Sequence, residues 1–181
     1  MKLSHSVIFI LILCLFSCVS QDSNSQSSNS FTRISAKTYP IEVVLSENDS
    51  SYFERDIIVD LSSSDFIINN FGGIVAYKLE DLKFEISAFN GSESVQSDFI
   101  ISFIDANGSL GSPVTYGDIP LYTFWQNQNL IIVNHSSATI NQVEESMGIH
   151  KELIVHIEGM VSEKPVDFEA TFYITINISG K

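Results

Sequence analysis

The feature that most constrains the fold is a strict alternation of apolar and polar residues near the C-terminus. From residue 168 to residue 178 every second residue is apolar, and the residues between are Glu, Thr, Tyr, Thr and Asn. Successive side chains of a β-strand point to opposite faces, so this period predicts a strand with one buried face. A strand buried on both sides in a parallel sheet would be apolar at nearly every position. The segment therefore favours an antiparallel sheet.

Shorter strand-like segments, separated by turn residues, fill most of residues 33–181. Apolar and β-branched runs bounded by Gly, Pro, Asn, Asp or Ser are typical of strands. We expect residues 162–165 to form a tight turn that joins the last two strands as a hairpin. Strands are predicted at residues 41–45, starting after Pro40, and at 53–61, 74–89, 99–104, 130–133, 153–161 and 168–178, with 111–120 as a loop or irregular edge strand and 121–125 as a short strand.

Two segments are typical of short helices. Residues 65–71, between a serine run and a pair of glycines, are expected to form a helix or, equally well, a loop. Further on, Thr139 and Gln142 fit a capping box in which Thr139 is the N-cap, and Gly148 is expected to end that helix. The face of this helix expected to cover the core holds Ile140, Val143 and Met147.

Many short strands and few helices predict an all-β fold. We expect an antiparallel β-sandwich, immunoglobulin-like or jelly-roll-like, with one or two short helices. The absence of an internal sequence repeat disfavours a propeller or solenoid. A single domain of about 150 residues can bury roughly 70% of its unfolded surface, which is enough for a core.

The N-terminus has the pattern of a secretory signal peptide. Lys2 provides a positive charge, and residues 7–16 are almost entirely apolar. This run is too short to cross a bilayer as a helix, which requires about 20 apolar residues. Residues 1–17 are therefore predicted to be a signal peptide.

Leu15, Ser17 and Cys18 resemble the lipobox of bacterial lipoproteins, although Phe16 departs from the small or β-branched residue usual at its position. The resemblance implies that Cys18 is lipidated and becomes the mature N-terminus, which attaches the protein to a membrane of the bacterial cell envelope. Val19 stands where an aspartate signals inner-membrane retention in enteric bacteria, so the outer membrane is favoured. The domain can face either the periplasm or the outside. The alternative is ordinary secretion, with Gln21 as the new N-terminus.

The sequence divides into three parts: signal peptide 1–17, lipidated cysteine and tether 18–32, and a β-sandwich domain 33–181. The tether is expected to be flexible because residues 19–30 are mostly Ser, Asn and Gln, with little to bury. The closing half of the domain is similar to uncharacterised exported bacterial lipoproteins in its expected elements, namely a small helix, a strand, a Pro-containing turn and a long last strand. This similarity implies no function.

Charge and cysteine content limit the possible partners. Both cysteines, Cys14 and Cys18, belong to the signal segment, so the mature domain has neither a free thiol nor a disulfide. The formal net charge is −13, and removal of residues 1–17 takes away Lys2 and no acidic residue, which makes it −14. Such a charge argues against binding nucleic acid or an anionic lipid surface electrostatically.

The sequence has no recognisable catalytic motif. It lacks a G-x-S-x-G elbow, a P-loop and a G-x-G-x-x-G loop, and no two histidines have the spacing of a helical zinc site. Residues 105–109 begin like a calcium loop without its later ligands, so a hairpin turn is expected. Glu80 and Asp81 are adjacent and are expected to point apart on their strand. No metal, cofactor or catalytic residue is predicted.

The stretch most suggestive of a binding site is residues 116–129. Tyr116, Tyr122 and Trp125 lie there beside Asp, Asn and Gln, a composition found on sugar-stacking surfaces and at protein hot spots. The alternative is that Phe124 and Trp125 simply close one end of the core.

We therefore hypothesise a non-enzymatic binding or structural module acting through protein–protein interaction with another envelope protein. The alternatives are carbohydrate or small-ligand binding through residues 116–129 and, third, a hydrolase with carboxylates placed by the fold.

Overall fold

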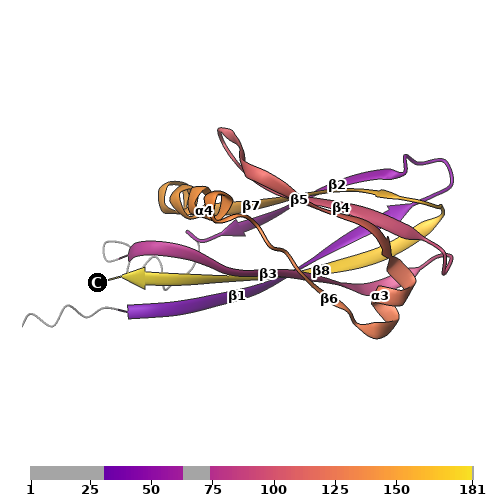
Figure 1. Ribbon diagram of the computed structural model, residues 1–181, viewed down its shortest axis with the longest axis horizontal. Coiled ribbons are helices and arrows are strands. Elements are labelled where there is room, and N and C mark those ends of the chain that lie inside the picture. Colours follow the sequence, from indigo (N-terminus) through magenta and orange to yellow (C-terminus); the bar gives the residue numbers. More distant parts are fainter. Residues whose placement is uncertain (1–30, 63–73, 181) are drawn as a thin grey trace, which may run out of the picture.

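The protein folds into two facing antiparallel sheets, as seen in a computed structural model that describes residues 31–62 and 74–180. One sheet has the strand order β1-β8-β3-β6 and the other β2-β7-β4-β5, and Figure 1 shows them as two layers. Neither helix within the described ranges is long and apolar enough to cross a membrane. The elements are β1 (Phe31–Leu45), β2 (Tyr52–Asp60), β3 (Ile74–Asn90), β4 (Gln96–Asp105), β5 (Gly108–Pro120), α3 (Leu121–Asn127), β6 (Leu130–Ile132), α4 (Ser137–His150), β7 (Glu152–Val161) and β8 (Val166–Gly180).

The strand pairing is that of a jelly roll. β1 pairs with β8, β2 with β7, β3 with β6 and β4 with β5, as if one long double-stranded hairpin had been rolled up. Rolling adds the contacts of β3 with β8 and of β4 with β7, which complete the two four-stranded sheets. The expected antiparallel sandwich is therefore confirmed, and the strand order assigns it to the jelly-roll alternative.

A cluster of phenylalanines holds the two sheets together. Phe84 and Phe172 stack with ring centroids 5.1 Å apart, and Phe99 lies 5.1 Å from Phe84. Phe53 and Phe168 extend the cluster in edge-on contacts. The inward residues of β8 are buried as the alternation predicts, namely Phe168, Ala170, Phe172, Ile174, Ile176 and Ile178.

The predicted hairpin between the last two strands is wrong. β7 pairs with β2 and β4 in one sheet, whereas β8 pairs with β1 and β3 in the other. Residues 162–165 thus lead from one sheet to the other. The physical reason is that nested jelly-roll pairing places β7 beside β2 and β8 beside β1, so β7 and β8 lie in opposite sheets.

The first strand begins earlier than predicted. β1 starts at Phe31 and contains Pro40, which pairs opposite Thr171 of β8. β1 is an edge strand, where a proline is tolerated because the ladder on one side needs no amide hydrogen from it. Residues 31 and 32, which we assigned to the tether, belong to this strand because β8 extends to Gly180 and pairs with them.

Residues 121–125 form part of a helix rather than the predicted strand. α3 follows Pro120, and Gln128 ends it in the left-handed conformation, with φ at 50°. A run of five mostly apolar residues does not distinguish a strand from a short helix by periodicity. Residues 111–120, expected to be a loop or an irregular edge strand, form part of the edge strand β5. The strand expected at 130–133 is present as β6.

The second predicted helix is present but longer than expected. Its N-cap is Ser136, whose hydroxyl accepts a hydrogen bond from the amide of Thr139 at 3.1 Å, so Thr139 is not the cap. The helix continues past Gly148 to His150, and Lys151 ends it. Its buried side is as expected, with Val143 and Met147 fully buried and Ile140 packed on the core. The helix or loop expected at residues 65–71 lies outside the described residues.

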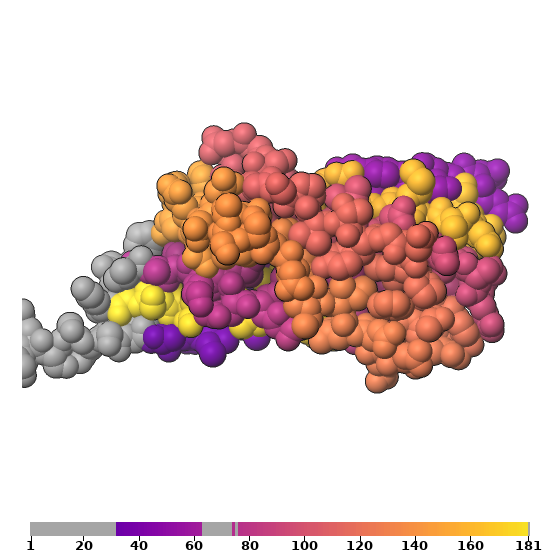
Figure 2. All heavy atoms as spheres, viewed as in Figure 1, coloured from indigo at the N-terminus to yellow at the C-terminus, as the bar shows by residue number. Residues whose placement is uncertain are grey.

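Residues 121–150 close one side of the sandwich. Figure 2 shows α3, β6 and α4 running across this side from one end of the molecule to the other. α4 contacts strands of both sheets, β3 in one and β5 and β7 in the other. This segment therefore covers the open side between the layers.

A β-bulge changes the direction of one acidic side chain in β3. The register with β8 shifts between Leu79 and Asp81, and Leu79 and Leu82 both face the core. Two residues instead of one lie between these leucines, so Glu80 and Asp81 share the outer face. The expectation that they point apart is therefore wrong, because a bulge interrupts the alternation of the strand.

Candidate functional site

The three aromatic residues nominated from the sequence do not form one site. Tyr116 lies on β5 with its ring edge-on to the core residue Phe84, at 5.9 Å between centroids. Its hydroxyl donates a hydrogen bond to the carbonyl of Ile132 at 2.9 Å. Burial raises the pKa of Tyr116 above its ordinary value. Tyr116 thus joins β5 to β6 as part of the packing.

Tyr122 and Trp125 lie together on α3, next to a residue that sequence reasoning missed. Phe89 of β3 lies 6.2 Å from the Tyr122 ring and 6.4 Å from the Trp125 ring, and these two rings are 6.0 Å apart. Trp125 is 37% exposed. The proximity of Phe89 could not be seen in the sequence, because the contact depends on α3 packing against β3. The alternative expectation was that Phe124 and Trp125 both close one end of the core. Phe124 is packed on the core, whereas Trp125 is partly exposed.

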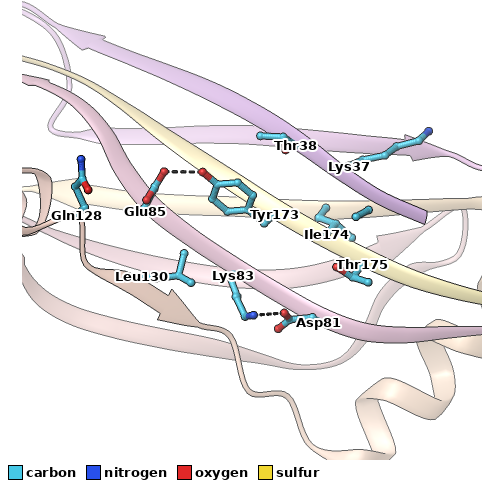
Figure 3. A pocket seen from close by; sticks show the side chains of 11 residues that line it. Lys37, Thr38, Asp81, Lys83, Glu85, Gln128, Leu130, Tyr173, Ile174 and Thr175 are labelled. Carbon is cyan, nitrogen blue, oxygen red and sulfur yellow. Dashed lines mark hydrogen bonds and ion pairs between the residues drawn. The ribbon is translucent and has the colours of Figure 1, made fainter. Parts of the chain in front are cut away.

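A groove crosses the outer face of the β1-β8-β3-β6 sheet. Its volume is about 530 Å³, and its lining comes from all four strands and from the C-cap of α3. Thr38, Tyr173 and Lys83 lie opposite one another on β1, β8 and β3. Neighbouring rungs add Thr175 and Asp81 on one side of this row, and Glu85 and Leu130 on the other. Figure 3 shows these side chains on the outer face of the sheet.

Contacts within the groove fix its polar groups. The hydroxyl of Tyr173 donates a hydrogen bond to Glu85 at 2.6 Å, and this bond raises the pKa of Tyr173. Lys83 forms an ion pair with Asp81, and both side chains are about 30% exposed. The Nζ of Lys37 donates to the carbonyl of Asp60 at 3.2 Å instead of pointing into the groove. The groove is therefore polar and carries both signs of charge.

An apolar row lies on the outer face of the other sheet. Ile58, Ile154 and Ile104 are opposite one another on β2, β7 and β4. Ile58 is 56% exposed, and the other two are half-buried. We call these three residues the isoleucine row. In the sequence, each of these strands has an isoleucine at a position where the alternation predicts a polar, outward-facing residue. The pattern of a single strand does not show that the three isoleucines lie side by side.

Next to the isoleucine row, His156 is surrounded by carboxylates. Its Nδ1 lies 2.7 Å from Asp56 Oδ1, and its Nε2 lies 3.1 Å from Glu158 and 3.7 Å from Glu54. Burial lowers the pKa of His156, but its hydrogen bonds to Asp56 and Glu158 outweigh burial and hold it above the usual 6.5. His156 lies on the outer face of its strand, between the buried residues Val155 and Ile157.

The Tyr52 hydroxyl shares these carboxylates. It has one hydrogen to donate, which is within reach of Glu158 at 3.1 Å and of Glu54 at 3.3 Å. Burial and the hydrogen bond to Glu158 raise the pKa of Tyr52 to about 12. Tyr52 therefore remains a neutral donor at physiological pH and stabilises the carboxylates by a hydrogen bond.

The composition of this cluster superficially matches a Ser-His-Asp triad, since Ser102 lies opposite His156 on β4. The hydrogen bond from Nε2, however, goes to Glu158 rather than to a serine hydroxyl. A nucleophile needs a base within hydrogen-bond reach. The cluster is thus a charge network on an open sheet face and has no activated nucleophile.

Each of the two groove carboxylates, Asp81 and Glu85, is bound by a neighbouring side chain of the groove. Along a strand, Asp81 and Glu85 have Cα atoms roughly 13 Å apart at about 3.3 Å per residue. Lys83 holds one carboxylate and Tyr173 the other. Glycoside hydrolases place their two carboxyl groups about 5–9.5 Å apart. Within residues 31–62 and 74–180, no group of three His, Cys, Asp or Glu residues could hold a metal ion.

The remaining sequence predictions concern a turn and the anchor. Asp105 and Gly108 form the end of the β4–β5 hairpin, as expected, and the Asp105 carboxylate accepts hydrogen bonds from Asn107 and Ser146. Cys18 lies outside the described residues.

Comparison with known proteins identifies no family. No protein-family model matches the sequence, and no curated protein is similar to it. Among solved structures, a chain of tobacco necrosis virus is 9% identical over 82% of this chain and 95% of its own length, with a TM-score of 0.40. A decameric BFDV capsid protein is 6% identical over 82% of this chain and 99% of its own length, with a TM-score of 0.43.

A chain of turnip yellow mosaic virus is similar in the same degree, at 9% identity over 82% of this chain and 94% of its own, with a TM-score of 0.39. At these low identities and TM-scores the similarities carry no argument about function. The assignment to a jelly roll therefore stands on the strand order of this chain itself.

Proposed function

We propose that this protein is a lipid-anchored, non-enzymatic module of a bacterial envelope that acts through protein–protein interaction. The anchor is Cys18, which the lipobox-like sequence assigns, and the outer membrane is the favoured location. Attachment would be stable, because two or more acyl chains anchor a protein firmly where one alone is marginal. The anchored domain then presents its sheet faces to partners.

The isoleucine row carries this proposal. Three large apolar side chains aligned across adjacent strands bury apolar area when a partner covers them, at roughly 25 cal/mol per Å². The carboxylates of Glu54, Asp56 and Glu158 lie beside the row, and an acidic margin next to an apolar centre favours a partner with basic side chains around an apolar patch.

Site-specific photo-cross-linking in the cell that makes the protein tests this proposal. A photo-reactive amino acid replaces Ile58, and the same residue replaces Ile34 as the matched control. Ile34 is also an edge-strand isoleucine, 65% exposed, but it belongs to the other sheet. We expect a single adduct of defined mass from position 58 and none from position 34. Equal adducts from both positions, or none from position 58, would contradict the proposal.

Carbohydrate or small-ligand binding through residues 116–129 is the second candidate function. The observation that favours it is the cluster of Phe89, Tyr122 and Trp125, in which the indole is partly exposed and the side-chain amide of Gln126 donates a hydrogen bond to the Tyr122 hydroxyl. A sugar stacked on Trp125 would change its fluorescence, and Trp125 is the only tryptophan of the chain. Silence across a broad glycan panel would exclude this cluster.

A further inference from the structure

We infer that the groove on the outer face of the β1-β8-β3-β6 sheet is a binding site for a neutral saccharide. This inference goes beyond the protein–protein interaction proposed above and does not use the isoleucine row, which lies on the other sheet. It also places the sugar site away from the aromatic cluster on α3. The groove, with Asp81, Lys83, Glu85 and Tyr173 at its centre, is shown in Figure 3.

Size and polarity of the groove limit the ligand class. A volume of about 530 Å³ lies within the roughly 300–1,000 Å³ of small-molecule sites. Such sites are mostly apolar, whereas this one contains two carboxylates, an ammonium group, hydroxyls and an amide. An apolar ligand would displace water from the lone pairs and N–H groups that these side chains do not use among themselves, and leaving those unpaired costs free energy. The ligand must therefore be polar over much of its surface.

The hydrogen-bonding groups of the groove suit hydroxyls, which both donate and accept. Asp81 and Glu85 each have lone pairs left after their contacts with Lys83 and Tyr173, so they can accept from a ligand. The Lys83 ammonium has three N–H groups and can donate to a ligand as well as to Asp81. Gln128, at the C-cap of α3, adds an amide that does both.

Charge in the groove excludes anionic ligands. Lys83 neutralises Asp81, and the Nζ of Lys37, the other cation of the lining, is directed to the carbonyl of Asp60. The Glu85 carboxylate is then the charge that faces a ligand. A phosphate or carboxylate ligand would meet like charge there. The ring of Tyr173 and the side chain of Leu130 provide the apolar surface on which the C–H face of a sugar ring packs. These properties together describe a neutral saccharide.

The groove is built before any ligand arrives. Its residues lie on paired strands, the alternation of β3 places Asp81 on the same face as Lys83 and Glu85, and Tyr173 donates a hydrogen bond to the Glu85 carboxylate. Sites on strands keep their geometry better than sites on loops. Because the groove is open, the ligand stays partly hydrated, and we expect a dissociation constant on the order of 1 mM.

Saturation-transfer NMR on the full lipidated protein tests the inference, in a detergent without a sugar head group. The probes are neutral mono- and disaccharides, with glucuronate and glucose 6-phosphate as anionic controls. We expect saturation transfer to at least one neutral saccharide and none to the anions. The Glu85→Gln and Lys83→Gln variants, each checked for folding by circular dichroism, are expected to weaken that binding about tenfold.

Two further variants distinguish the groove from the other surfaces. Trp125→Ala removes the exposed indole of the aromatic cluster, and Ile58→Glu alters the isoleucine row; neither should change saccharide binding. Silence across the neutral panel, binding that survives both groove variants, or binding lost only in Trp125→Ala would each overturn the inference. Cross-linking at position 58 is a separate readout, so the protein–protein proposal can fail or succeed independently of this one.

Discussion

At the scale of single residues, the fold raises the pKa of His156 through hydrogen bonds to neighbouring carboxylates. This histidine lies among three carboxylates of its sheet, from Glu54, Asp56 and Glu158. Its positive charge offsets their repulsion. When His156 is neutral, three carboxylates of like charge remain close together without a cation between them.

We predict that the contribution of His156 to stability depends on pH. Its pKa in the folded protein lies above the usual 6.5, so this contribution is full below pH 6.5 and is lost as the pH rises through the raised pKa. The free energy of unfolding of His156→Gln, compared with the unchanged protein, should differ most near pH 6 and least near pH 9. The difference should be about 1 kcal/mol at most, because Asp56 is half exposed and solvent screens the pair.

Urea denaturation at a series of pH values measures this difference. The Asp56→Asn variant is the control, since it keeps His156 but replaces the charged partner of Nδ1. In that variant the pKa of His156, followed by NMR, should fall. A difference in stability between His156→Gln and the unchanged protein that stays constant from pH 6 to pH 9 would show that the charge network does not act as described.

At the scale of elements, Gly159 shows how closely β7 packs. A Cβ atom there would overlap the ring of Phe53 and lie 2.5 Å from the carbonyl oxygen of Asp98. The backbone oxygen belongs to the neighbouring strand β4 and cannot move without breaking the ladder. Gly159 therefore allows β7 to lie under the Phe53 ring.

We predict opposite effects for two glycine substitutions. Gly159→Ala should lower the free energy of unfolding by about 1–3 kcal/mol, as overpacking does. Gly148→Ala is the matched control, because nothing lies within 4 Å of its Cβ position and alanine is about 1 kcal/mol better than glycine inside a helix such as α4. Urea denaturation of both variants checks the prediction, and a Gly159→Ala protein as stable as Gly148→Ala would refute the packing described.

Elements were more predictable from the sequence than their pairing. The alternation in β8 predicts its buried face because burial repeats with the period of the strand. Pairing depends on contacts between segments that are distant in the sequence. Because β7 and β8 are close in the chain, the sequence suggested a hairpin, but the two strands lie in different sheets. Residues 121–125 are too few for periodicity to separate helix from strand, and a bulge at Asp81 is invisible to a regular pattern.

The candidate sites were predicted only in part, for a related reason. Tyr122 and Trp125 are close in the chain and stay together, but Phe89 joins them from another element, and Tyr116 packs against Phe84 instead. The groove and the isoleucine row combine residues of three or four strands. No single strand has an unusual composition at these positions. The residues of each surface lie together only because of the register between the strands.

At the scale of the whole molecule, the proposed anchor and the two binding surfaces have separate places. β1 begins at the end of the sandwich where β8 finishes, so a lipid at Cys18 would hold the domain by this end (Figure 1). The groove and the isoleucine row lie on the outer faces of opposite sheets. A ligand in the groove and a partner on the isoleucine row could therefore bind at the same time.

The central claim is that the protein is a lipid-anchored module bound to another protein. The most direct measurement is the intact mass of the protomer and of its complex, purified from the native membrane in mild detergent. We predict a protomer that starts at Cys18 and carries two or three acyl chains, in a complex with a stoichiometric second protein. An unmodified protomer starting at Gln21, with no partner protein in the complex, would contradict the claim.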